Sequence, residues 1–86
     1  MGAETLEESI YAAIIRVAPE VDPRTLDPRI ALRDQVEMDS VDFLGFVLDL
    51  ERRLGLKVPE LDYPRLASIA GCIAYLGSPG GERPAP

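Results

Sequence analysis

Helical periodicity occurs in three separate stretches of this 86-residue chain, and proline-bearing segments divide them. Apolar residues recur at three- and four-residue steps over residues 4–17, 39–54 and 68–76, a pattern typical of amphipathic helices. A chain of this length has room for one small domain and no second lobe. The sequence therefore predicts an all-α fold, a small bundle of three main helices.

The first predicted helix ends at Pro19, since proline lacks the amide hydrogen that a continuing helix needs. We expect one long ordered loop from Ala18 to Met38, without regular structure and broken by Pro23 and Pro28. Apolar side chains spaced through this loop are expected to pin it across the core: Leu26, Ile30, Leu32, Val36 and Met38.

The second predicted helix begins at Asp39-Ser40, with Asp39 as the N-cap, and Gly55 ends it. Apolar residues cover most of its surface, so we expect a central helix or one that carries an apolar docking surface. The polar or small residues that remain form a narrow stripe: Asp42, Gly45, Asp49 and Arg52.

Residues 60–66 are expected to form a short helix or turn, with Pro64 tolerated only within a first turn. Ser68 is the expected N-cap of the last helix, which places Cys72 on or beside its apolar face as a core thiol. Gly77 closes that helix. Residues 77–86 lack apolar content and are expected to form a disordered tail.

Charge and composition exclude several classes of function. The net charge of −6 argues against a nucleic-acid partner and against an anionic membrane. The chain has one cysteine and no histidine, which argues against a disulfide, a metal site, and Ser-His or Cys-His catalysis. With no long apolar run and an acidic start, we expect a cytoplasmic protein that is not inserted in a membrane. The small size and the missing histidine indicate a protein that is not an enzyme.

The segment Met38-Asp-Ser-Val-Asp42 is the most informative candidate site. It puts a hydroxyl at the start of a helix, where free amides and the helix dipole favour a phosphate. The alternative is that Asp39 and Ser40 serve only as a helix cap. The surrounding acidic cluster lacks the pattern of a calcium loop and is interpreted as a collar that attracts a basic enzyme.

The order of motifs between about Leu6 and Leu76 resembles the acyl carrier protein family, whose members bind phosphopantetheine. The resemblance rests on four segments of this chain: Leu32-Arg-Asp-Gln-Val36, Met38-Asp-Ser-Val-Asp-Phe-Leu44, Leu48-Asp-Leu-Glu-Arg-Arg-Leu-Gly-Leu-Lys-Val-Pro59 and Leu66-Ala-Ser-Ile69. It implies a carrier domain over residues 1–76, with three main helices and one short one. It also implies that Ser40, beside Asp39, carries covalent 4'-phosphopantetheine, whose terminal thiol holds the cargo as a thioester.

The chain departs from the family pattern at several positions near this serine. Val41 stands where the family usually has leucine, Glu37 where it usually has glycine, and Gly45 and Arg52 where it often has glutamate. These departures indicate a specialised carrier. Its partners are expected to recognise residues along the second helix: Val41, Asp42, Phe43, Leu48 and Arg52. For Arg52 and Arg53 the alternative is a solvated helix end, favoured by the dipole.

The function expected from these observations is that of a monomeric acyl carrier in lipid or specialised metabolite biosynthesis. Its partners would be a phosphopantetheinyl transferase that uses coenzyme A, an acyl- or aminoacyl-loading ligase, and downstream synthases or transferases. Two alternatives stay open: a carrier of aminoacyl or other small polar cargo, and a helical adaptor without a prosthetic group that docks a partner helix. A helix-turn-helix DNA binder is disfavoured by the acidic charge.

Overall fold

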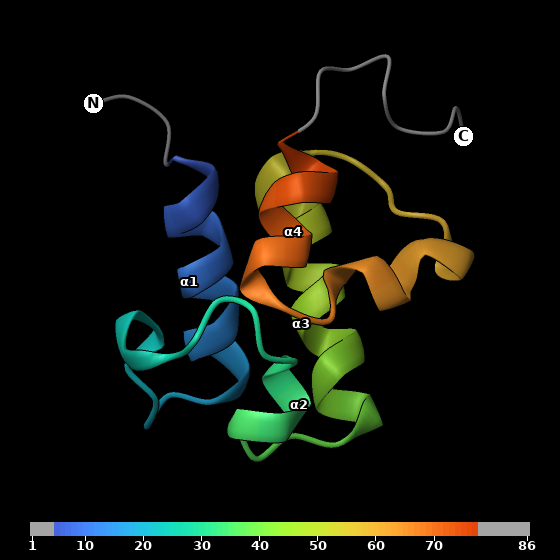
Figure 1. Ribbon diagram of the computed structural model, residues 1–86. Helices are drawn as coiled ribbons and strands as arrows, with labels where there is room; N and C mark the ends of the chain where they lie inside the picture. Colours follow the sequence, from blue (N-terminus) through green and yellow to red (C-terminus); the bar gives the residue numbers. More distant parts are fainter. Residues whose placement is uncertain (1–4, 78–86) are drawn as a thin grey trace.

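The computed structural model describes residues 5–77, and within this range the chain is entirely helical (Figure 1). The elements run in the order α1 (Leu6–Val17), η1 (Pro23–Thr25), α2 (Leu32–Gln35), α3 (Ser40–Leu54), η2 (Glu60–Leu66) and α4 (Ile69–Leu76), where η1 and η2 are three-ten helices. The predicted all-α bundle is confirmed. Its three main helices are α1, α3 and α4, and η2 is the short one.

A capping box starts α1, and its apolar face builds the core. The Thr5 side chain accepts a hydrogen bond from the Glu8 amide at 3.1 Å, and the Glu8 carboxylate accepts one from the Thr5 amide at 3.0 Å. Along the rest of the helix, Ile10, Ala13 and Ile14 are fully buried. The buried face is the one predicted from the helical spacing of the apolar residues.

Helix α1 packs along α3 and also contacts α4. The start of α1 and the end of α4 lie at one end of the bundle, and α2 and the start of α3 lie at the opposite end (Figure 1). The segment η2 packs against α4. This arrangement brings α2, the start of α3 and η2 to one region of the surface.

The connection between α1 and α3 is ordered, but the prediction that it lacks regular structure is wrong. It contains η1 and the four-residue helix α2. The Asp22 carboxylate starts η1 by accepting the Arg24 amide at 3.1 Å, with Pro23 in the first turn. Leu32 anchors α2 in the core. Of the predicted anchors, Leu32, Val36 and Met38 are buried and Leu26 is partly buried, whereas Ile30 is exposed and does not pin the loop.

Backbone hydrogen bonds attach this connection to the distant end of the chain. The Leu32 amide donates to the Ala67 carbonyl at 2.7 Å, and the Ala70 amide donates to the Pro28 carbonyl at 2.8 Å. Within the connection, the Gln35 side chain donates to the Asp27 carbonyl at 2.8 Å and accepts the Asp27 amide at 3.0 Å. Helix α2 therefore has a fixed position although it is only four residues long.

The predicted boundaries of α3 and α4 are confirmed, whereas the prediction for Pro64 is wrong. Gly55 ends α3 in the left-handed conformation with φ of 67°, which glycine adopts without a Cβ penalty. Ser68 caps α4 by accepting the Gly71 amide at 3.0 Å. Pro64 is the fifth residue of η2, not part of its first turn. It is tolerated because a three-ten helix is a run of short turns, in which proline removes one donor.

Two side-chain contacts hold η2 and the extended segment before it. The buried Glu51 carboxylate accepts the Val58 amide at 2.7 Å, and the Tyr75 hydroxyl donates to Asp62 at 2.7 Å. The predicted tail lies outside the described residues apart from Gly77, which is the C-cap of α4. No helix in residues 5–77 is long and apolar enough to cross a membrane.

Candidate functional site

Ser40 is the first residue of α3, and its side chain is exposed. The preceding residue, Asp39, is the N-cap: its carboxylate accepts the Asp42 amide at 2.9 Å, and the Asp42 carboxylate accepts the Asp39 amide at 3.3 Å. The predicted cap is therefore confirmed, and Asp42 completes a capping box. Because Asp39 satisfies the helix start, the Ser40 hydroxyl is not needed for capping.

Ser40 lies at a surface groove of about 460 Å³ that three elements form together. Helix α2 supplies Arg33, α3 supplies Phe43 and Leu44 next to Ser40, and η2 with the residue after it supplies the opposite wall. That wall consists of Glu60, Tyr63, Pro64 and Ala67. The lining is mostly apolar, with charged groups from Arg33 and Glu60.

The phenol of Tyr63 lies in a part of this groove that is close to negatively charged side chains. Burial raises the pKa of Tyr63 above its ordinary value, and the negative charges of Glu51 and Glu60 raise it further. The Tyr63 hydroxyl is therefore neutral and remains a hydrogen-bond donor over the physiological pH range.

The predicted recognition residues of α3 divide between two faces. Val41, Leu48 and Arg52 lie at helical spacing on one exposed face. Val41 is 75% exposed, Leu48 is 46% exposed, and the Arg52 side chain is 66% exposed. Leu44, which is 43% exposed, lies between them. Phe43 is instead partly buried, lines the groove and packs against Phe46 with ring centroids 5.9 Å apart. Asp42 is held in the capping box.

The prediction that Asp49 belongs to a polar stripe on the surface of α3 is wrong. This side chain is only 3% exposed and binds Arg52 and Arg53 through separate carboxylate oxygens, with 2.6 Å between the Arg53 Nε and Asp49 Oδ2. A carboxylate can be buried here because two guanidinium groups compensate its charge. Arg52 and Arg53 are thus not a purely solvated helix end.

The remaining candidates from the sequence do not form a site. Cys72 is fully buried in the core as predicted, and burial raises the pKa of its thiol to about 12, so it is neutral and unreactive. Within residues 5–77, no group of His, Cys, Asp or Glu side chains is arranged to hold a metal ion. The acidic residues near Ser40 include exposed Asp34, Glu37 and Asp39.

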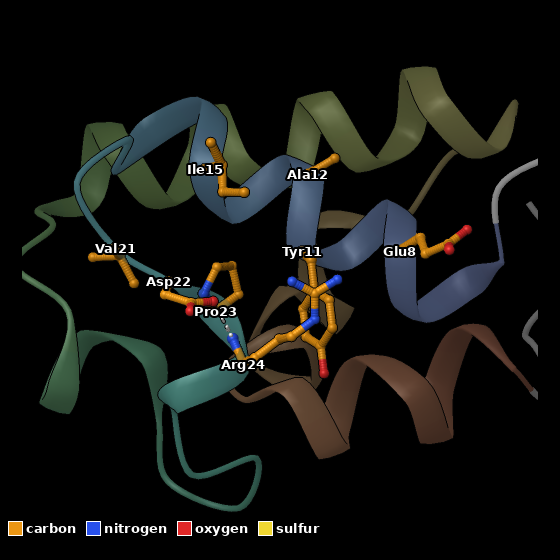
Figure 2. A pocket seen from close by; sticks show the side chains of 8 residues that line it. All are labelled: Glu8, Tyr11, Ala12, Ile15, Val21, Asp22, Pro23 and Arg24. Carbon is orange, nitrogen blue, oxygen red and sulfur yellow. Dashed lines mark hydrogen bonds between the residues drawn. The ribbon is translucent and has the colours of Figure 1, made fainter.

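A second hollow, of about 430 Å³, lies between α1 and η1 and does not include Ser40 (Figure 2). Within it, the Arg24 guanidinium lies 6.0 Å from the centre of the Tyr11 ring. The Tyr11 hydroxyl donates to Glu7 at 3.1 Å. The other two charged lining residues also have partners: the Glu8 carboxylate accepts the Thr5 amide, and the Asp22 carboxylate accepts the Arg24 amide.

Sequence reasoning missed the groove and the charged residues that line it. Arg33, Glu60 and Tyr63 come from segments that are far apart in the chain, so no local pattern links them. The burial of Asp49 had a signal: two arginines follow it at three- and four-residue steps, the spacing of ion pairs on a helix.

A family model described as "Phosphopantetheine attachment site" matches residues 8–76, most of the chain. The chain belongs to this family. The match spans α1 to α4 and thus every element that forms the groove beside Ser40.

Curated relatives of this carrier are acyl carrier proteins. It is 26% identical over 81 residues to the meromycolate extension acyl carrier protein of Mycobacterium tuberculosis, covering 91% of this chain and 70% of the relative. The protein of the same name from Mycolicibacterium smegmatis is 27% identical over 84 residues, covering 95% and 85%. The acyl carrier protein of Lactobacillus johnsonii is 27% identical over 75 residues, covering 84% and 94%. No solved structure gave a significant match.

The carrier's cofactor is covalently bound 4'-phosphopantetheine, and the region around Ser40 fits this group. The attachment needs an exposed hydroxyl that no structural hydrogen bond requires, and Ser40 supplies one. The groove beside it offers apolar surface from Phe43 and Leu44 to an arm that leaves the serine.

Proposed function

We propose that Ser40 is the residue that carries 4'-phosphopantetheine, and that the protein presents an acyl group to partner enzymes as a thioester on the terminal thiol of this arm. One observation carries the proposal: Asp39 caps α3, so the adjacent Ser40 hydroxyl is exposed and free to be esterified. Esterification of a capping hydroxyl would disrupt the helix start, whereas esterification of Ser40 leaves the cap in place.

Attachment is a transfer from coenzyme A. The Ser40 Oγ forms a bond to the phosphorus next to the pantetheine, the pyrophosphate bond breaks, and adenosine bisphosphate leaves with the displaced electron pair. The serine proton passes to a base of the transferase. No base of this chain is required, which is consistent with a sequence that has no histidine.

The protein's part in later steps is to carry and to dock. Its one cysteine is buried with a raised pKa and cannot serve as a nucleophile. We infer that a loading ligase and downstream synthases or transferases act on the thioester, and that the protein is their covalent cosubstrate. Their docking surface is the exposed face of α3 that begins beside Ser40, with Val41, Leu48 and Arg52 on it.

An acyl cargo is favoured over an aminoacyl one because the relatives are named as acyl carrier proteins. The groove beside Ser40 is mostly apolar, which also suits an acyl chain. Lipid or specialised metabolite biosynthesis is the expected setting. The departures from the family pattern at Glu37, Gly45 and Arg52 favour a specialised carrier over one that serves the housekeeping fatty-acid synthase.

The decisive experiment is the intact mass of the protein after incubation with coenzyme A and a broad-specificity phosphopantetheinyl transferase. We expect the wild type to gain one phosphopantetheine and Ser40→Ala to gain none. The matched control is Ser68→Ala, which removes a different helix-start serine and should still be modified. Modification of Ser40→Ala would refute the assigned site, and a wild type left unmodified would favour the adaptor alternative.

A further inference from the structure

The groove beside Ser40 contains one cationic side chain, Arg33, among its lining residues. We propose that Arg33 is the residue that binds the phosphodiester once the arm is attached to Ser40. This inference rests on the proposed function, because it requires a phosphate at Ser40. It assigns a binding role to a residue of α2, outside the segment that contains the serine.

A phosphodiester at Ser40 enters an acidic environment. The carboxylates of Asp39 and Asp42 lie at the start of α3, and exposed Glu37 precedes them. Each is a like charge for the phosphate and raises the free energy of the modified state. A nearby cation offsets part of this repulsion.

Arg33 lies close enough to Ser40, and is free enough of other ion pairs, to supply that cation. It is exposed, it shares the groove with Ser40, and no carboxylate in residues 5–77 lies within ion-pair distance of it. Guanidinium groups bind phosphate oxygens through two parallel hydrogen bonds, a geometry that lysine does not offer. Several other arginines already have partners: Arg24 and Arg65 lie over tyrosine rings, Arg29 is near Asp27, and Arg52 and Arg53 bind Asp49.

The backbone that carries Arg33 is held firmly, which lowers the entropy cost of the contact. On one side, Leu32 is fully buried and its amide donates to the Ala67 carbonyl at 2.7 Å. On the other, the Gln35 side chain bonds the backbone of Asp27 and Ile30. The guanidinium therefore needs to order only its own side chain to reach the phosphate.

The test compares apo and holo forms of the wild type, Arg33→Gln, Arg33→Lys and the control Arg29→Gln. Arg29 is 87% exposed and lies outside the groove, so its variant removes the same charge without the contact. Each form is measured by thermal unfolding at about 0.01 M and about 1 M salt, where the Debye length is about 30 Å and 3 Å. The phosphorus NMR signal of each holo form is recorded as well.

We expect attachment of the arm to favour folding of the wild type about threefold more than that of Arg33→Gln at low salt, a difference in Tm of about 3–5 °C. The difference should disappear at high salt, Arg33→Lys should restore part of it, and Arg29→Gln should match the wild type. The phosphorus signal should shift in Arg33→Gln, shift less in Arg33→Lys, and keep the wild-type position in Arg29→Gln. If all variants gain the arm but show the same holo-minus-apo difference and the same phosphorus signal, the role of Arg33 is refuted. If the wild type gains no arm, the proposed function fails instead.

Discussion

Replacement of the buried Asp49 by asparagine should be among the most destabilising single changes at a polar residue of α3. The Asp49 side chain is 3% exposed and binds two arginines that differ in exposure, with 66% for Arg52 and 30% for Arg53. A hydrogen bond to a charged group contributes about 1.5–3 kcal/mol when it is sheltered. The largely exposed bond to Arg52 is screened by solvent and adds about 0–1 kcal/mol. We therefore expect Asp49→Asn to lower the free energy of unfolding by about 2–3 kcal/mol.

The assay is urea unfolding at neutral pH, with Asp34→Asn as the matched control. Asp34 is exposed on α2, so the same change of charge and atoms should alter stability there by less than about 0.5 kcal/mol. A double-mutant cycle with Arg52→Ala and Arg53→Ala then divides the effect. The coupling of Asp49 should be larger with Arg53 than with Arg52.

The reasoning would be refuted by an Asp49→Asn variant within about 0.5 kcal/mol of the wild type. It would also fail if Arg52 accounted for most of the coupling, since the more exposed bond would then be the stronger. The outcome decides what Arg52 does. A weak coupling leaves most of its guanidinium donors available to a docking partner, whereas a strong one assigns it to holding α3.

Three further predictions concern local features of the fold and the site. Because burial raises the folded-state pKa of Cys72 from 9.0 to about 12, its stabilisation is present below pH 9.0 and is lost as the pH rises toward 12. The stability advantage of the wild type over Cys72→Ala should therefore shrink by up to about 1.4 kcal/mol per pH unit in that window, measured by urea unfolding at a series of pH values. Gly55→Ala should cost about 1 kcal/mol through its positive φ alone, since a Cβ there meets no atom within 4 Å; Gly55→Asn should cost less, and equal costs would contradict this cause. Asp39→Asn should leave the helix cap and the melting temperature unchanged, because asparagine caps helices as well as aspartate does. It should slow the transfer of the arm, measured by intact mass at successive times, because the carboxylate charge attracts the basic transferase. An unchanged rate would show that Asp39 acts only as a cap.

The sequence was sufficient to predict elements whose determinants are local. The three main helices have apolar residues at helical spacing, and each has a polar cap and a clear end, as with Asp39 and Gly55 for α3. The start of α3 and the exposure of Ser40 follow from the same few residues. The helix start at Asp39 and Ser40 is therefore predictable from local residues, whereas the attachment role of Ser40 was implied by the resemblance to the carrier family.

Features that depend on tertiary contacts could not be predicted in the same way. Helix α2 is too short to be stable alone and exists because Leu32 is buried and bonded to Ala67, 35 positions later in the chain. On α3, periodicity identified the apolar residues but could not tell which of them other helices would bury. In the structure, Leu44 and Leu48 are exposed whereas Asp49 is buried. The groove requires α2, α3 and η2 together.

The order of Asp39 and Ser40 explains how one short segment serves both the fold and the proposed chemistry. A helix start needs a side-chain acceptor, and a carrier needs a hydroxyl whose modification does not disturb the fold. If a serine were itself the cap, esterification would remove the acceptor and weaken the helix that partners dock on. Here the Asp39 carboxylate accepts a hydrogen bond from the Asp42 amide, and Ser40 follows it as an exposed residue in the first turn. The two requirements are met by neighbouring residues, so the arm can be added while the start of α3 stays intact.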